Sequence, residues 1–371
     1  MSEARRALAI PSLDGVRAVS IGLVFAGHVG FDFTPGGFGV TVFFVLSGYL
    51  ITTLLRLEHD RTQTVSLKHF YARRAFRIWP AFYALLVIAA VCTAVFGLGF
   101  GRVNSLPLIA EFGHFWNYFS IFYRGPQRPM PGTEILWSLA VEEHFYFVLP
   151  LLFIVMNRFR LALRRQAIVL ISLAATVVVW RCILVYGLNA QQPRTYFATD
   201  TRADSLFLGC AMALWANPVL DTIRQSSVAI RNQAIGGFIA ILASLSYRNF
   251  EFREGFRYTI QAAGVVLILR YVIAAPKAPV GRVLNTPIMA WLGKLSYPFY
   301  LIHYMVVLEL FKHISNGPVT GRVIVASIAA PLSLALAWCL QRGLMDPATR
   351  FRQRVVDPKL APPKSAAAST R

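Results

Sequence analysis

Long apolar runs are the feature that most constrains the fold of this chain. Segments of about 20 mostly apolar residues, the length that crosses the hydrocarbon core of a bilayer, recur along all 371 residues. Only 15% of the residues are charged, against about 25% in soluble domains. The sequence therefore predicts an all-α, polytopic integral membrane protein. Ten spans are expected, at about 16–31, 37–55, 80–100, 136–156, 167–186, 202–216, 234–247, 258–275, 290–311 and 321–341.

These runs leave no room for a separate soluble domain. We expect residues 1–354 to form one transmembrane domain, and the Pro- and Ala-rich segment 355–371 to be a disordered cytoplasmic tail. The first apolar run is not expected to be a cleavable signal peptide, because no small-residue cleavage site closes it and a second span follows almost at once. The spacing of the four cysteines predicts neither a metal site nor a disulfide framework.

The formal net charge of +20 could suggest a nucleic-acid partner, but its distribution argues against one. With both termini in the cytoplasm, most Lys and Arg residues fall in the cytoplasmic loops and few in the outer loops. This is the positive-inside bias of membrane proteins, and it fixes the orientation of the bundle. The charge therefore mainly reports topology, and no nucleic-acid partner is expected.

Two ionisable side chains, Arg17 and His28, lie in or beside the first apolar run, LDGVRAVSIGLVFAGHVG. In a helix, eleven residue steps make three turns plus about 20° and a rise of about 16 Å. The two side chains would then share one face at different depths. Ionisable groups at membrane depth usually face the protein interior and mark a functional path.

A cationic motif, FYARRAFRIWP, precedes the third expected span. Arg74 and Arg77 are three residues apart and would share a helix face. Guanidinium groups are permanently charged and match the geometry of phosphate. The alternative is that these arginines are ordinary positive-inside anchors.

An acidic motif, WSLAVEEHFYFVLP, opens the fourth expected span. Ser138 and Glu142 are four residues apart and can share a face, and Glu143 follows directly. Two adjacent acids at membrane depth must be paired or protonated. An interhelical ion pair is the structural alternative to a catalytic or binding role.

Two further motifs, RADSLFLGCAMALW and WLGKLSYPFYLIHYMVV, place polar residues in apolar surroundings. For Arg202 and Asp204 a structural salt bridge is at least as good an interpretation as a ligand contact. Ser296, Tyr300 and His303 are spaced by four and three residues, which aligns them on one helix face. A lone histidine in such a run is more often a hydrogen-bonded interior residue than a catalyst.

Taken in order, these segments resemble the acyltransferase-3 family of polytopic membrane acyltransferases, which includes many bacterial O-acetyltransferases of surface polysaccharides. The resemblance extends from residue 12 to residue 303. One departure is Met345-Asp346-Pro347, where the family often carries a Glu-x-Pro element, and whether Asp346 replaces that glutamate is open. The matching stretches are SLDGVRAVSIGLVFAGH, GGFGVTVFFVLSGYLI, FYARRAFRIWPAFY, WSLAVEEHFYFVLP, RADSLFLGCAMA and WLGKLSYPFYLIH.

The resemblance implies an acyl-CoA donor, most often acetyl-CoA, that approaches from the cytoplasm. Arg17, Arg74 and Arg77 would bind its phosphates, and the thioester would lie near His28. His28 would act as general base on a sugar hydroxyl, as an imidazole can near neutral pH. Glu142 would orient or charge-stabilise His28, with Asp32 as a rival for that role.

The remaining candidates are expected to contact substrate or to support the site. No metal and no permanently bound cofactor are expected, because a thioester is already an activated acyl donor. Expected partners are acyl-CoA, a glycan or lipid-linked saccharide acceptor, membrane lipid and polysaccharide-assembly proteins, and the expected location is the bacterial inner (plasma) membrane. The supporting candidates are Asp14, Ser138, Glu143, Arg202, Asp204, Ser296, Tyr300 and His303.

The leading hypothesis is thus a membrane acyltransferase that acetylates a glycan hydroxyl on the outer side. A transporter or flippase of a polar or lipid-linked substrate is the alternative, because buried Arg, His and Glu also suit a translocation path. Against it, the sequence shows no internal inverted repeat of the kind that many transporters carry. A membrane subunit of a polysaccharide assembly, without chemistry of its own, is a third interpretation.

Overall fold

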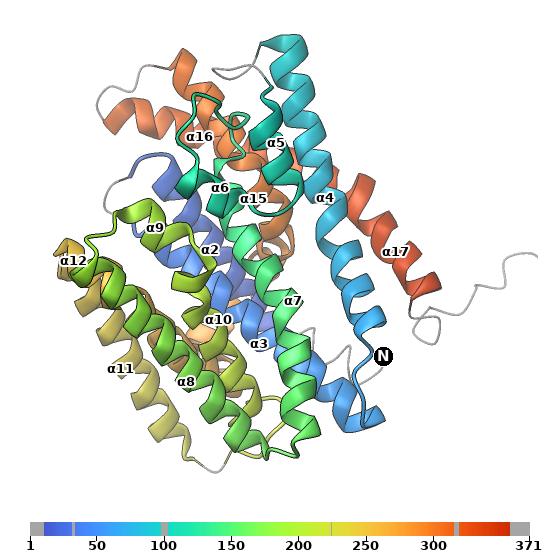
Figure 1. Ribbon diagram of the computed structural model, residues 1–371, viewed down its shortest axis with the longest axis vertical. Coiled ribbons are helices and arrows are strands. Elements are labelled where there is room, and N and C mark those ends of the chain that lie inside the picture. The colour runs from blue at the N-terminus through green and yellow to red at the C-terminus, as the bar shows by residue number, and fades with distance from the viewer. Residues whose placement is uncertain (1–10, 32–33, 98–102, 224, 315–318, 357–371) are drawn as a thin grey trace, which may run out of the picture.

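The computed structural model describes residues 11–31, 34–97, 103–223, 225–314 and 319–356, which fold as an all-α bundle (Figure 1). In the labels used below, η1 is a short 3₁₀ turn, and η2, η3 and η4 are single π-helical turns. The elements are α2 Pro11–His28, α3 Gly36–Thr62, α4 Leu67–Phe96, α5 Ser105–Phe112, α6 Trp116–Phe122, η1 Glu134–Leu136, α7 Trp137–Arg158, α8 Leu163–Cys182, η2 Ile183–Gly187, α9 Gln192–Phe197, α10 Thr199–Leu214, α11 Ser227–Ser246, α12 Phe250–Phe252, η3 Arg253–Arg257, α13 Tyr258–Ala274, α14 Pro279–Leu284, α15 Pro287–His313, α16 Val319–Leu340, η4 Gln341–Met345 and α17 Asp346–Val355.

Within the described ranges, seven helical stretches are long and apolar enough to cross a membrane. The chain is therefore a polytopic membrane protein, as the apolar runs predict. Each of the seven overlaps one of the ten expected spans. They are Gly36–Thr62, Leu67–Val95, Glu134–Arg158, Leu163–Gly187, Ser227–Ser246, Phe250–Ala274 and Val319–Val355.

The other three expected spans also form helices, α2, α10 and α15, but these are shorter or more polar. Helix α2 carries Asp14 and Arg17, and α10 has 16 residues that include Arg202 and Asp204. Helix α15 is long enough to cross, but lysine, histidine and tyrosine lower its apolar character. The same residues that point to function therefore weaken the membrane-span signal. The count of ten spans and the cytoplasmic placement of both termini stay predictions.

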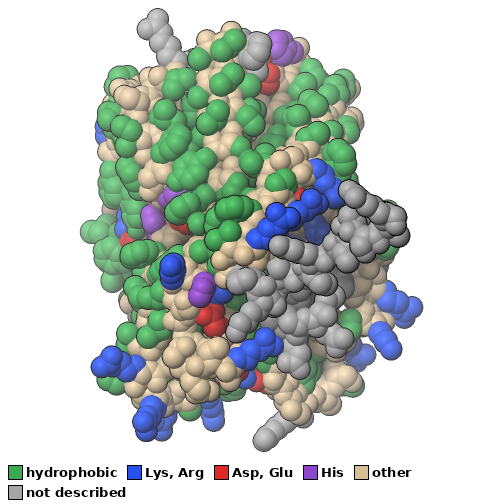
Figure 2. All heavy atoms as spheres, turned by 90° about the vertical axis from the view of Figure 1, so that its right-hand side faces the viewer, with side chains coloured by type: hydrophobic (Ala, Val, Ile, Leu, Met, Phe, Trp, Pro, Cys, Tyr) green, Lys and Arg blue, Asp and Glu red, His purple; other side chains and the backbone are tan. Residues whose placement is uncertain are grey.

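Helix α3 is the central element of the bundle, with 78% of its most apolar window buried. Only 28% of the same window is buried in the spans that contain α8 and α11, and 22% in the span Val319–Val355 that contains α16. These helices therefore lie at the periphery of the bundle. Figure 2 shows one face of the molecule, hydrophobic over its upper half and with Lys and Arg side chains gathered in the lower half. An apolar band beside a basic end is the surface that a bilayer with a positive inner side requires.

Helix α4 begins well before the span that the sequence predicts at 80–100, and this early start places the cationic motif on a helix. The side chain of Ser66 caps the helix by accepting a hydrogen bond from the backbone N–H of His69, at 3.4 Å. At the other end, Gly97 adopts a left-handed conformation with φ +61°, which ends the helix. Arg74 and Arg77 therefore lie on a helix, as their spacing predicts.

Glycines let the central helices approach closely. A Cβ atom added to Gly48 of α3 would lie 2.1 Å from the carbonyl oxygen of Leu206 on α10, and one added to Gly209 would lie 2.1 Å from that of Val45. On α15, a Cβ at Gly293 would lie 1.9 Å from the carbonyl oxygen of Asp14 on α2. Contacts of this kind, small residues against backbone, are typical of membrane helix packing.

The C-terminal end of the described chain continues from α16 through η4 into α17. Helix α17 packs beside α4, where Phe351 and Phe76 have ring centroids 5.7 Å apart. The predicted disordered tail starts at residue 355, but residues 355 and 356 are described and Val355 ends α17. The rest of that tail, residues 357–371, lies outside the described residues.

A substitution at the contact of α3 and α10 tests this packing. Gly48→Ala should lower stability by about 1–3 kcal/mol, because overpacking forces the two helices apart. The measurement is the thermal unfolding midpoint of the purified protein in detergent. Gly236→Ala is the matched control, since a Cβ there meets nothing within 4 Å and alanine is the better helix former. Equal midpoints for the two variants would contradict the close contact.

Candidate active site

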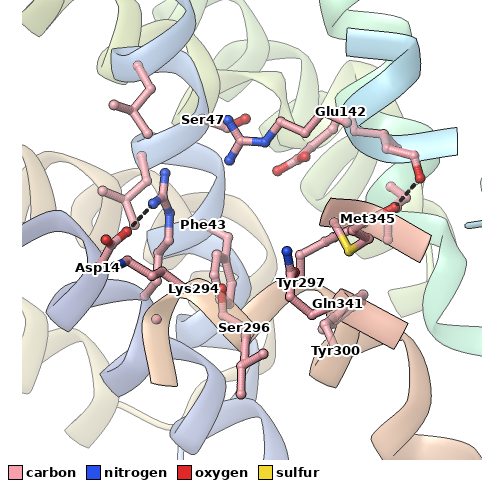
Figure 3. Close-up of a pocket in the computed structure, with 18 of the residues that line it drawn as sticks. Asp14, Phe43, Ser47, Glu142, Lys294, Ser296, Tyr297, Tyr300, Gln341 and Met345 are labelled. Carbon is pink, nitrogen blue, oxygen red and sulfur yellow. Dashed lines mark hydrogen bonds and ion pairs between the residues drawn. The ribbon is translucent and has the colours of Figure 1, made fainter. Parts of the chain in front are cut away.

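A cavity of about 600 Å³ lies between α2, α3, α4, α7 and α15, with η4 and α17 completing its wall. Figure 3 shows Asp14, Glu142 and Tyr300 reaching it from three of these helices. Most of the sequence-predicted candidates line it, whereas His28, His303, Arg202 and Asp204 do not. The lining candidates are Asp14, Arg17, Arg74, Arg77, Ser138, Glu142, Glu143, Ser296 and Tyr300.

Three arginines from two helices make one part of the cavity wall cationic. Arg17 donates a hydrogen bond to Asp14 at 2.5 Å, one helical turn away on α2. On α4, Arg74 and Arg77 line the cavity, and the guanidinium of Arg74 lies 5.6 Å from the ring centroid of Tyr146. Their neighbour Arg73 does not line the cavity and donates to Glu58 at 2.5 Å. Arg73 is four residues from Arg77, so spacing alone does not exclude it from the cavity, and its ion pair with Glu58 is what distinguishes it.

Glu142 belongs to a polar network on the same cavity wall. Tyr146, four residues later on α7, donates to its carboxylate at 3.1 Å, and the Tyr146 hydroxyl forms a short hydrogen bond with Ser47 of α3. Glu142 also interacts electrostatically with Arg74 and Arg77. The carboxylate therefore lies among cations, which offsets part of the cost of placing an acid in an apolar bundle.

Two hydroxyl groups tie α7 to α15 at the cavity wall. The Tyr300 hydroxyl donates to the carbonyl oxygen of Ile135 at 2.8 Å and lies 2.7 Å from the Ser138 hydroxyl. The Ser138 hydroxyl lies 3.3 Å from the same carbonyl oxygen, so the two hydroxyls and Ile135 form one hydrogen-bonded group. Ser296, one turn before Tyr300, also lines the cavity.

His28 and His303 form a hydrogen-bonded pair of nearly parallel rings next to the cavity. His28 is the last residue of α2, and its ring lies 5.1 Å from that of His303 at an interplanar angle of 14°. The two rings share a hydrogen bond of 2.8 Å between Nδ1 of His28 and Nε2 of His303. Tyr300 lines the cavity, and its ring centroid is 5.8 Å from that of His303. The residue Tyr300 thus links the cationic cavity to the histidine pair.

The structure gives His28 a different partner from the one expected. Among the described residues, no hydrogen bond, ion pair or ring contact joins Glu142 to His28, and the rival Asp32 lies outside them. The partner is His303, which sequence reasoning placed only among supporting residues. The two histidines are 275 positions apart, so no local spacing signals their contact.

Arg202 and Asp204 belong to a separate buried cluster. Asp204 forms an ion pair of 3.1 Å with Arg181 of α8, and both side chains are fully buried. A structural salt bridge therefore exists, but its cation is Arg181 rather than Arg202. The Arg202 guanidinium lies 4.0 Å from the ring centroid of Tyr258 and donates to Thr41 at 2.9 Å.

Some lining residues were not singled out from the sequence. These are Lys294 and Arg342, which add two cations to the cavity. Asp346, which the sequence offers in place of the family's glutamate, also lines the cavity, and it accepts a hydrogen bond of 2.7 Å from Gln341. Lys294 lies in the motif WLGKLSYPFYLIH, where a charge within an apolar run indicates a functional residue. Together with the three arginines, these cations could bind the phosphates of a nucleotide-bearing donor. Across the described ranges, no group of three His, Cys, Asp or Glu side chains could hold a metal ion.

Comparison with known proteins gives one family and a consistent set of relatives. The peptidoglycan O-acetyltransferase OatA of Listeria monocytogenes is 33% identical over 80% of this chain and 49% of its own length. A candidate peptidoglycan O-acetyltransferase of Bacillus subtilis is 30% identical, covering 87% of this chain and 53% of its own length. A candidate O-acetyltransferase of Staphylococcus aureus is 30% identical over 88% of this chain and 55% of its own.

The chain spans about half the length of these curated relatives. No solved structure matches it. The family model described as an acyltransferase domain matches residues 10–342, which include every candidate residue of the cavity and the histidine pair except Asp346. The chain therefore belongs to the acyltransferase-3 family of membrane proteins.

Proposed function

We propose that this protein is an O-acetyltransferase of the bacterial plasma membrane that moves an acetyl group from acetyl-CoA to a hydroxyl of a surface or lipid-linked glycan. The observation that carries the proposal is the cationic cavity with a histidine pair next to it, linked through Tyr300. The relatives named as peptidoglycan O-acetyltransferases support a cell-wall glycan as the class of acceptor.

The cavity suits the donor in charge and in shape. Arg17, Arg74 and Arg77 keep their charge at any physiological pH and can form paired hydrogen bonds to phosphate oxygens. Phe43 and Leu46 of α3 give an apolar wall for the narrow pantetheine arm. Low-dielectric walls strengthen the attraction between these cations and an anionic donor. The acetyl thioester would then lie toward Tyr300 and the histidine pair.

The acids of the cavity have a role that fits their place among the arginines. Asp14 and Glu142 offset part of the positive charge, which keeps the empty cavity from strong self-repulsion. Tyr146 and Ser47 in turn hold Glu142 in position. A phosphate group that enters would compete with these carboxylates for the guanidinium groups. Glu142 therefore acts on donor binding in this proposal rather than as the orienting partner of His28.

The transfer needs one base, and it involves no oxidation or reduction. His28 takes the proton of the acceptor hydroxyl as its oxygen attacks the thioester carbonyl carbon. The carbon–sulfur bond then breaks, and the leaving thiolate takes the proton back from His28. The products are the O-acetylated glycan and free CoA. With both termini cytoplasmic, the donor enters from the cytoplasm and the acceptor meets His28 nearer the outer side.

Removing the cavity arginines should weaken donor binding. The variant Arg74→Ala with Arg77→Ala should bind acetyl-CoA at least tenfold more weakly, since hydrogen bonds to charged groups contribute about 1.5–3 kcal/mol each. Equilibrium binding of acetyl-CoA to the purified protein in detergent measures this. Arg73→Ala is the control, because Arg73 pairs with Glu58 outside the cavity. An unchanged affinity in the double variant would disprove the phosphate contact.

Removing the base should stop the chemistry but not donor binding. His28→Ala should lower transfer of labelled acetyl groups to a cell-wall glycan in proteoliposomes by about 10²–10⁴-fold, the usual contribution of general base catalysis. Acetyl-CoA affinity should stay that of the parent protein. His313→Ala removes an exposed histidine of α15 and should transfer normally.

Two results of the same assay would count against the proposal. Full transfer by His28→Ala would rule out this base. Movement of the glycan across the membrane without label transfer, in the parent protein, would favour the transporter alternative.

A further inference from the structure

The buried ring of His303 has a fixed partner at each of its nitrogens. Nδ1 lies 3.0 Å from the carbonyl oxygen of Phe299 and 2.8 Å from that of Tyr300, both in the preceding turn of α15. A carbonyl oxygen can only accept a hydrogen bond, so Nδ1 carries the single hydrogen of the neutral ring. Nε2 of His303 therefore presents a lone pair, and its partner is Nδ1 of His28, 2.8 Å away.

The position of the ring hydrogen on His303 determines the tautomer of His28. Because Nε2 of His303 can only accept, Nδ1 of His28 must be the donor. A neutral imidazole has one ring hydrogen, so Nε2 of His28 is left unprotonated. That nitrogen is the one that can take a proton from a hydroxyl group.

The surrounding rings keep His303 in this orientation. Its ring stacks on Phe299 with centroids 5.4 Å apart and an interplanar angle of 4°. The ring centroid of Phe25 on α2 lies 6.2 Å from that of His303, and the two ring planes are tilted by 60°. The ring of Tyr304 lies 4.6 Å from that of His28. Since the carbonyl acceptors belong to the same helix as His303, rotation of its ring would break its hydrogen bonds and its ring stacking together.

We infer that His303 is a positioning residue that fixes the Nδ1–H tautomer of His28 and so makes Nε2 of His28 the catalytic base. The inference rests on the proposed function, in which His28 is that base. During transfer, Nε2 of His28 gains the hydroxyl proton and later gives it to the CoA thiolate, while Nδ1–H stays bonded to His303. His303 neither gains nor loses a proton, which is why its role is to orient and not to react.

Two substitutions of His303 in the full-length protein test the inference. His303→Leu removes the acceptor and should lower kcat by roughly 10²–10⁴-fold, since a misplaced tautomer cost about 10⁴ in the serine protease triad. Acetyl-CoA affinity should not change. His303→Gln keeps an oxygen that can accept from Nδ1–H of His28 and should recover part of the lost kcat. His313→Leu, the same replacement at an exposed site of α15, should leave kcat unchanged.

Nitrogen-15 NMR spectra of the histidine rings report the tautomer directly, and a change in packing alone would not alter that tautomer. The signals of His28 are identified by their loss in His28→Ala. In the parent protein these signals should be those of the Nδ1–H tautomer, and in His303→Leu they should report a mixture of tautomers. Because His303→Gln preserves a polar partner, it carries the test if the leucine variant does not fold.

The outcomes separate this inference from the function on which it rests. An Nε2–H tautomer of His28 in the parent protein, or normal kcat in a folded His303→Leu, would overturn the role of His303 even if His28→Ala is inactive. Full transfer by His28→Ala would instead overturn the base assignment, and the spectra would still decide whether His303 sets the tautomer.

Discussion

Polar groups inside an apolar bundle must find their partners within the protein, because the surrounding lipid offers none. This constraint determines how the helices of this protein pack. Asp204 of α10 accepts from Arg181 of α8 and from Thr259 of α13, so one carboxylate joins three helices. Ser138 and Tyr300 join α7 to α15 in the same way. Each such contact fixes both the neighbours and the depth of the helices that carry it.

At the cavity this pairing of charges is incomplete. Arg17 has Asp14 as its partner and Arg342 has Asp346, but the cations that line the open volume, with Arg74, Arg77 and Lys294 among them, outnumber its acids. Outside the cavity, the buried charge of Arg181 is matched within the protein by Asp204. A group of cations around an open cavity instead favours an anionic ligand, which is the physical basis for assigning the donor to this site.

What the sequence predicts well here is local. The spacing of Arg74 and Arg77 is enough to predict that the two share a face, because residues three apart on a helix are neighbours. The spacing does not single out Arg73, which is four residues from Arg77 and pairs with Glu58. The polar residues of α2 likewise lie on one helix, as expected. Contacts between helices are different: the pairing of His28 with His303, and of Asp204 with Arg181, depends on tertiary packing. No spacing along the chain contains that information, so the partner of each was missed.

The histidine pair also fits the dielectric environment in which it lies. A buried carboxylate that oriented His28 would have to be desolvated, and its charge would cost several kcal/mol unless another group paired with it. In the proposed function, the chain from His28 through His303 to the carbonyl oxygens of α15 is neutral before transfer, so it would orient the base without burying a permanent ion. The acids of the protein can then remain where cations already balance them, around Arg74 and Arg77. On this proposal, the charged groups that bind the donor are kept apart from a neutral base, which an apolar bundle can accommodate with little desolvation cost.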